Sequence, residues 1–174
     1  MKGERILNGR EPDTSMIILD PRSVKTTFVA EEKGFDGGKK ISGIKLHVGV
    51  DVLGLPHALL VKTAEVGDRK GAEEMVKAHA SNLRSLTAML EDGGYTGEKL
   101  AGAMFRMTGA EVQIAKRNEL HKFAVIPKCW VVERSFAWLD NYRRLWKNCE
   151  RKLDTSLQMT TLAFVALLLK RWRC

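Results

Sequence analysis

Several features that define common protein classes are missing from this 174-residue chain. Its three cysteines are far apart, with no CxxC pair, and its four histidines form no HExxH motif. A disulfide framework and a zinc site are therefore not expected, and this cysteine usage indicates an intracellular protein.

Long apolar runs are also missing. Residues 1–15 are polar and lack the apolar core of a signal peptide. The longest apolar stretch, residues 162–169, is too short to cross a bilayer and is followed by Lys170 and Arg171. We expect a buried terminal helix there, and no membrane partner.

The chain does have an excess of positive charge. Its formal net charge is +8 and its pI is about 9.5, while 44% of its residues are hydrophobic. Such a chain is long enough for one globular domain with a hydrophobic core. The charge favours a polyanionic partner without distinguishing nucleic acid from other acidic partners.

The first half of the chain has the pattern of a strand meander. A linker or frayed start is expected at residues 1–15, and the apolar run at 16–19 predicts a buried strand that ends at Asp20. A charged, glycine-rich loop is expected at residues 31–40. Alternating apolar residues at 44–50 predict a half-exposed strand, and the turn at 51–56 leads to a third strand at 58–63.

The second half alternates helices with strands. The expected elements are a helix at residues 68–80 capped by Asp68, a strand at 86–90, a helix at 97–108, strands at 112–115 and 123–126, a long helix at 127–150 and a last helix from 154 or 155 to 172. This order predicts an α/β domain over residues 16–174 with a ribonuclease H-like mixed sheet and C-terminal helices.

Three acids in this pattern are candidates for a metal site. Asp20 follows the first apolar run, and Asp92 lies just beyond the run at 86–90. The first and fourth strands of a ribonuclease H-like sheet are neighbours, so these acids should converge, and Glu133 lies in the long helix. Clustered carboxylates stay ionised together when a cation neutralises them, and oxygen ligands suit Mg²⁺ or Mn²⁺. Two such ions about 3.5–4 Å apart catalyse attack on phosphodiesters.

Five segments carry a resemblance to a known family: residues 20–25 (DPRSVK), 34–40 (GFDGGKK), 51–55 (DVLGL), 92–95 (DGGY) and 130–139 (WVVERSFAWL). They resemble bacterial insertion-sequence transposases, most closely the Insertion Sequence 5 family of DDE transposases. The resemblance implies a ribonuclease H-like catalytic fold, Mg²⁺-dependent cleavage at element ends and strand transfer into target DNA. It also implies that Asp20, Asp92 and Glu133 are the catalytic and metal-binding acids.

The chain departs from the family pattern around these acids. Pro21 and Arg22 replace a serine and a glutamine, residues 43–47 (GIKLH) replace a basic cluster, and Cys129 replaces an arginine. These changes remove or move phosphate-binding charges and leave the metal ligands in place. Only 19 residues precede Asp20, so we expect the helical DNA-end-binding region of the family to be absent. The chain would then be the downstream half of a split or frameshifted gene, or a truncated copy.

The basic residues near the predicted acids are candidate phosphate contacts. They are Arg22, Lys25, Lys39, Lys40, Lys45, His47, Arg134, Arg143 and Arg144. A charge run on a helix is more often a solvated face. Asp51 and Asp68 compete as ligands, but a hairpin position and a helix cap explain them.

Two functions stay open. The chain is an active nuclease and strand transferase, or it is an inactive relic that inhibits full-length copies by pairing with them. A host ribonuclease H or resolvase explains the acids but not residues 130–139. We expect DNA as a partner, a homo-oligomer or pairing with the product of an upstream frame, and a bacterial cytoplasmic, nucleoid-associated location.

Overall fold

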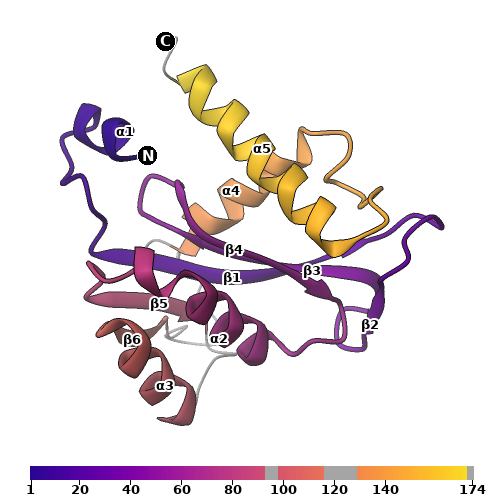
Figure 1. The fold of residues 1–174 in the computed structure, drawn as a ribbon, viewed down its shortest axis with the longest axis horizontal. Coiled ribbons are helices and arrows are strands. Elements are labelled where there is room, and N and C mark those ends of the chain that lie inside the picture. The colour runs from indigo at the N-terminus through magenta and orange to yellow at the C-terminus, as the bar shows by residue number, and fades with distance from the viewer. Residues whose placement is uncertain (93–97, 116–128, 172–174) are drawn as a thin grey trace, which may run out of the picture.

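A mixed β-sheet with helices on both of its faces forms the body of the protein (Figure 1). The computed structural model describes residues 1–92, 98–115 and 129–171. The strands are β1 (Met16–Lys25), β2 (Gly34–Asp36), β3 (Ile41–Val50), β4 (Pro56–Thr63), β5 (Ala88–Asp92) and β6 (Glu111–Ala115). Their order across the sheet is β2-β3-β1-β5-β6, and β4 pairs with β3.

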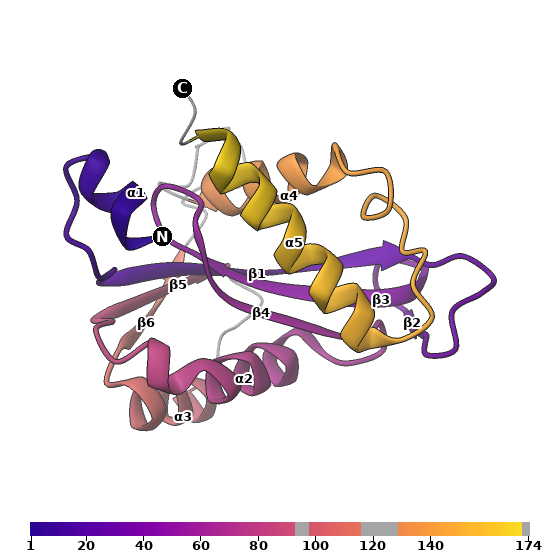
Figure 2. The ribbon, with the colours of Figure 1, turned by 45° about the horizontal axis from the view of Figure 1, so that its top comes forward.

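The helices are α1 (Lys2–Leu7), α2 (Asp68–His79), the short η1 (Ala80–Asn82), α3 (Glu98–Thr108), α4 (Cys129–Asp140) and α5 (Leu153–Arg171). Figures 1 and 2 agree that α2 and α3 cover one face of the sheet and that α4 and α5 cover the other. Within the described ranges, no helix combines the length and the apolar character that a membrane span requires.

Two hydrophobic cores lie on the two faces of the sheet, and β1 contributes to both. Its Ile17 and Leu19 pack with residues of α2 and α3, while Ile18 and Val24 pack with residues of α4 and α5. This division follows from the alternation of side chains along a strand. Helix α2 buries Ala72, Met75 and Val76 on one side, which is the spacing of an amphipathic helix.

The structure confirms the ribonuclease H-like mixed sheet that the sequence predicts. β1 pairs antiparallel with β3 and parallel with β5, so the first and fourth predicted strands are neighbours. The predicted end of the first strand at Asp20 was wrong. The strand continues to Lys25 because residues 21–25 pair with residues 43–47 of β3.

Other local predictions need correction. Residues 2–7 form a helix in place of a frayed start, and β2 lies within the expected loop at 31–40. The predicted long helix ends at Asp140. Residues 141–147 form turns instead, and these carry the chain to the end of β1, where Asn148 forms a β-bridge with Thr26 and its N donates to Lys25 O at 2.8 Å. The strand expected at 123–126 lies outside the described residues.

Candidate active site

The pairing of β1 with β5 determines where two of the three predicted acids lie. Leu19 pairs with Glu91 in the parallel register, so Asp20 and Asp92 are the next residues along the two neighbouring strands. The side chain of Asp92 lies outside the described part of the structure. The backbone thus brings positions 20 and 92 to the same end of adjacent strands.

Asp20 is half-buried and lies on the face of the sheet that α4 covers. The cross-strand neighbour of Asp20 is Val48, which belongs to the core beneath α4 and α5, as does Ile18. Side chains two residues apart share a face of a strand. Helix α4 packs on β1, β3 and β5, and it carries the exposed Glu133 beside the buried Val132. Two of the three acids therefore lie on one side of the sheet.

Arg22 fastens α4 to β1 close to both acids. It lies two residues after Asp20, donates from Nη1 to Phe136 O at 3.3 Å, and pairs through Nη2 with Asp140 at 2.8 Å. Phe136 is three residues after Glu133 on α4. Arg22 was predicted to contact DNA phosphate, but its guanidinium is occupied by α4, so its role in this structure is to position that helix.

The donor set suits a hard divalent cation. Asp20 and Glu133 both offer carboxylate oxygens, the ligands that Mg²⁺ and Mn²⁺ prefer. Among the side chains that the structure describes, which do not include Asp92, no three His, Cys, Asp or Glu residues are grouped closely enough to hold a metal ion. The assignment of the three acids as ligands therefore stays a prediction.

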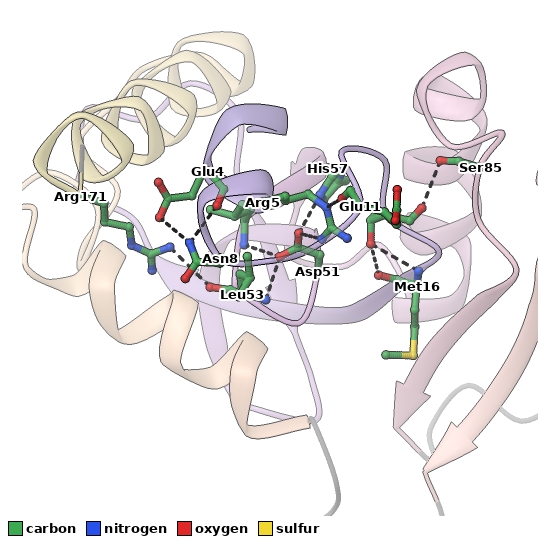
Figure 3. Close-up of polar contacts among 12 residues, drawn as sticks. Glu4, Arg5, Asn8, Glu11, Met16, Asp51, Leu53, His57, Ser85 and Arg171 are labelled. Carbon is green, nitrogen blue, oxygen red and sulfur yellow. Dashed lines mark hydrogen bonds and ion pairs between the residues drawn. The ribbon is translucent and has the colours of Figure 1, made fainter.

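Asp51, the competing acid, has a structural role in the β3–β4 hairpin. Its fully buried carboxylate accepts hydrogen bonds from Arg5 of α1, from His57 at 3.3 Å, and from the backbone N–H groups of Leu53 and Leu55 (Figure 3). Burial alone would raise the pKa of Asp51, but these hydrogen bonds lower it overall. Every partner here is a protein group, which agrees with the structural interpretation of this residue.

The same hairpin contacts α4. Gly54 has a φ of +78°, and a Cβ at this position would lie 2.8 Å from the ring of Trp138. Ser135 Oγ donates to Gly54 O at 3.4 Å and to Val131 O at 3.0 Å. Glycine is thus required both by the turn and by the close approach of α4. The hairpin therefore helps to set the position of the helix that carries Glu133.

Lys45 was predicted to contact DNA, but it is buried under α2 at 4% exposure. Its Nζ pairs with Asp68 at 2.8 Å and with Asp36 at 3.2 Å. Burial opposes the shift, yet the two carboxylates raise the pKa of Lys45 overall. Asp68 is the first residue of α2 and its side chain does not cap that helix, whose N-cap is Gly67. Lys45 is therefore a buried ion-pair residue and not a phosphate contact.

Asp36, at the end of β2, is held as a carboxylate by its surroundings. Ser23 Oγ donates to it at 2.6 Å, and the backbone N–H of Lys39 donates to it at 3.0 Å. These hydrogen bonds, together with Lys45, hold the pKa of Asp36 well below its usual range. Asp36 thus belongs to the same buried polar network as Lys45 and Ser23.

His47 was also predicted to contact DNA, and it too is buried, at 1% exposure. Neither ring nitrogen has a hydrogen-bond partner within the described structure. Burial lowers the pKa of His47 to about 4, so the ring is neutral near pH 7. Gly71 of α2 packs directly on the ring. The expected half-exposed strand at 44–50 was wrong because α2 covers this face of β3.

Glu91 is a residue that the sequence did not single out. It is fully buried beside Leu19 on the α2 and α3 side of the sheet, and neither of its oxygens has a hydrogen-bond partner in the described part of the chain. Burial raises the pKa of Glu91 to about 7. The sequence could have indicated Glu91, because it is an acid directly after an apolar run. That pattern was instead attributed to the adjacent Asp92.

The other predicted DNA contacts are on the surface. Lys25, Lys39, Lys40 and Arg143 are exposed, and Lys39 Nζ donates to Pro21 O at 3.3 Å. Arg144 is exposed but pairs with Glu150 at 2.7 Å.

Arg134 is half-buried, with its guanidinium over the rings of Trp130 and Trp138 at 4.6 and 4.9 Å from their centroids. Exposed Lys147 lies next to Asn148, which bonds to the end of β1, so this lysine is close to Lys25.

An antiparallel β1–β3–β4 meander that continues into parallel β5 and β6, with helices on both faces, defines a ribonuclease H-like domain. The chain belongs to the transposase DDE domain family, whose model matches residues 11–169. It is 33% identical over 119 residues to the Burkholderia cepacia protein assigned as transposase for insertion sequence element IS402, covering 64% of this chain and 56% of that protein.

The fold is similar to one chain of the cryo-EM structure of the simian T-cell lymphotropic virus intasome in complex with PP2A regulatory subunit B56 gamma. The TM-score is 0.56 at 14% identity, and the match covers 87% of this chain and 47% of that one. The chain thus spans about half the length of each relative. The narrower resemblance to the Insertion Sequence 5 family stays a prediction.

Proposed function

We propose that this chain is the catalytic domain of a DNA transposase that cleaves phosphodiester bonds and transfers DNA strands. Asp20, Asp92 and Glu133 would hold Mg²⁺ or Mn²⁺ for this chemistry. The observation that carries the proposal is the parallel pairing of Leu19 with Glu91, which makes positions 20 and 92 neighbours beneath the helix of Glu133.

When bound, divalent ions at such a site polarise the attacked phosphate and favour loss of the leaving oxygen. The protein's own contribution is to hold the acids in place. Arg22 fixes α4 against β1, and the hairpin at Gly54 contacts the other side of that helix. A site on strands and a packed helix keeps its ligands in a defined geometry.

The exposed basic residues would bind the DNA backbone without reading its sequence. Lys25 and Lys147 lie close together at the end of β1, and Lys39, Lys40 and Arg143 are also exposed. Such phosphate contacts orient DNA but do not specify bases. Assembly on DNA, with or without the product of an upstream frame, and a nucleoid-associated cytoplasmic location stay predictions.

The test is metal-dependent nicking of supercoiled plasmid that carries the element's terminal repeats, with Mg²⁺ or Mn²⁺ as the only added cofactor. We expect the full chain, alone or mixed with its upstream partner region, to nick this plasmid. Asp92→Ala and Glu133→Gln should abolish nicking while DNA binding persists, because the ligands and not the phosphate contacts are removed. Glu73→Gln, an exposed glutamate on α2, is the matched control and should keep full activity.

Two results would contradict the proposal. One is nicking by wild type that survives EDTA and both ligand variants. The other is no nicking with either metal by a mixture that binds the repeats. Loss of activity in Glu73→Gln as well would show that the ligand variants report on charge or folding rather than on metal binding.

A further inference from the structure

An open cleft of about 670 Å³ lies where α1, the β3–β4 hairpin, α4 and α5 meet. Three of its lining residues are basic, Arg134, Lys170 and Arg171, and one is acidic, Glu4. Figure 3 shows Arg171 of α5 reaching Leu53 of the hairpin, and Glu4 of α1 beside Asn8. The cleft is therefore built by four elements that are far apart in the sequence, and its lining has an excess of positive charge.

Two arginines in this cleft share one aromatic ring. The guanidinium carbons of Arg134 and Arg171 lie 4.9 and 4.3 Å from the ring centroid of Trp138. Trp130 adds a second ring 4.6 Å from Arg134. Stacking on an indole holds a guanidinium by its planar face and leaves the N–H groups at its edge available.

The described residues satisfy few of the N–H groups of these arginines. Arg134 has no hydrogen-bond or ion-pair partner among the described residues, and its Nε is buried. Arg171 donates one long bond to Leu53 O at 3.5 Å. Buried donors are nearly always paired in native proteins. These groups therefore have the geometry of an anion site whose ligand completes the hydrogen bonds.

The charges around Arg171 decide whether the cleft favours an anion. Burial lowers the pKa of Arg171, the positive charge of Arg134 lowers it further, and Glu4 and Asp51 oppose the shift. Asp51 is already bound to Arg5 and His57, and Glu4 accepts a bond from Asn8 at 3.4 Å. Two guanidinium groups on one ring repel each other. Glu4 offsets this repulsion at Arg171, so the burial of the Arg171 charge is what a bound anion would compensate.

We infer that this cleft binds a phosphate group of the DNA backbone through Arg134 and Arg171, with Trp138 as the platform that orients both. A phosphate matches the guanidinium fork and can accept from both arginines at once. The inference rests on the proposed function and deepens it. Arg134 directly follows Glu133 on α4, and neighbouring helix positions point in different directions, so the bound phosphate would lie on the side of α4 adjoining that of the proposed metal ligand.

The experiment measures DNA binding by fluorescence anisotropy, using the full chain and a short labelled duplex of arbitrary sequence over a series of salt concentrations. Arg134→Gln and Arg171→Gln should weaken binding at low salt. Each should reduce the slope of log K against log salt by up to about 0.9, the value for loss of the one phosphate contact that the two arginines share. Arg106→Gln is the matched control, because Arg106 is exposed on α3, on the opposite face of the sheet, and this variant should keep the wild-type slope.

Circular dichroism melting shows whether the variants fold. If the glutamine variants melt early, Arg134→Lys and Arg171→Lys decide the question, since they keep the charge but lose the planar fork; weaker binding with an unchanged slope is then expected. An unchanged slope and affinity in folded glutamine variants would overturn the inference. The inference would also be overturned if the glutamine variants lost binding to an acidic peptide while they kept wild-type binding to the duplex.

Failure of this inference is separable from failure of the proposed function. Glu133→Gln should keep the wild-type slope although it nicks nothing. Wild-type nicking with unchanged slopes in Arg134→Gln and Arg171→Gln would remove the phosphate site and leave the transposase. Reduced slopes in these variants, with no nicking by wild type, would support the phosphate site and contradict the proposed transposase activity.

Discussion

Arg5 of the N-terminal helix donates a hydrogen bond from its Nη1 to the fully buried carboxylate of Asp51 at the end of β3. The two residues are 46 positions apart in the chain, and both side chains are almost completely excluded from solvent. Arg5 also donates to Glu11 O at 2.8 Å. This pair makes the first residues of the chain part of the folded domain and ties them to the hairpin that contacts α4.

Arg5→Ala should destabilise the protein strongly. Removing one partner of a buried ion pair leaves an uncompensated charge, which costs about 3–5 kcal/mol. Urea unfolding followed by circular dichroism measures this loss. The control is Lys2→Ala, which breaks the exposed pair of Lys2 with Asp13 and should cost less than about 0.5 kcal/mol. Equal losses in the two variants would show that Asp51 is not electrostatically dependent on Arg5.

His47 should make stability depend on pH. Its pKa is lowered to about 4 in the folded protein, against about 6.5 when unfolded, so the unfolded chain binds the extra proton first as pH falls. Stability from this residue is fully present above pH 6.5 and is lost between about pH 6.5 and pH 4. From pH 7.5 to pH 5 the loss is about 2 kcal/mol, since one unit corresponds to about 1.4 kcal/mol.

The variant that isolates this effect is His47→Leu, which cannot take up a proton. Urea unfolding at pH 7.5 and pH 5 should show a smaller loss in the variant than in wild type, by about 2 kcal/mol. Acids that do not interact with His47 titrate equally in the two proteins, so the difference reports on His47 and on its coupling to Asp68 and Glu74. The same loss in both proteins would refute the lowered pKa.

Gly71→Ala should be destabilising because of the His47 ring. A Cβ at this position would lie 2.1 Å from two atoms of the ring, which is too close without movement of the ring or of α2. Overpacking of this kind costs about 1–3 kcal/mol. Thermal melting should show the loss, and Gly71→Ala combined with His47→Ala should lose less than the two single changes together. Gly37→Ala, with open space around it, is the control and should be nearly neutral.

Metal binding should stabilise the protein if the three acids form a site. At a Mn²⁺ concentration ten times its dissociation constant, the expected gain is about 1.4 kcal/mol, seen as a rise in melting temperature. Glu133→Gln should reduce this rise, because it removes a ligand, and Glu73→Gln should not. A rise that is the same in all three proteins would place the metal elsewhere.

Much of the catalytic fold could be predicted from local sequence. The apolar run at 16–19, the alternation at 44–50 and the run at 86–90 each produced a strand, because burial of one face or both requires such patterns. Strand order could also be predicted, since the meander and crossover pattern allows few topologies. Strand ends could not, because β1 extends beyond Asp20 only through its pairing with β3.

The candidate site also has parts that could be predicted from the sequence and parts that could not. The choice of the three acids rests on the sequence and its family resemblance. The pairing of Leu19 with Glu91 makes positions 20 and 92 neighbours, and the role of the acids as ligands stays a prediction. The roles of the basic residues could not be predicted from sequence. Lys45 and Arg22 were both predicted to contact phosphate. In the structure, Lys45 pairs with Asp68 of α2, and Arg22 pairs with Asp140 of α4.

The sequence by itself determined the class of fold and the type of most elements, though not α1, β2 or the end of α4, and it singled out the three acids. These depend on residue types at short spacing. Only the tertiary structure decided which basic side chains are exposed and which lie in ion pairs. A lysine or arginine is the same residue in solvent or in an ion pair, and its partner comes from a distant segment. Asp20, Asp92 and Glu133 therefore stay the predicted metal ligands, while the phosphate contact inferred for Arg134 and Arg171 depends on Trp138, because both guanidinium groups stack on its ring.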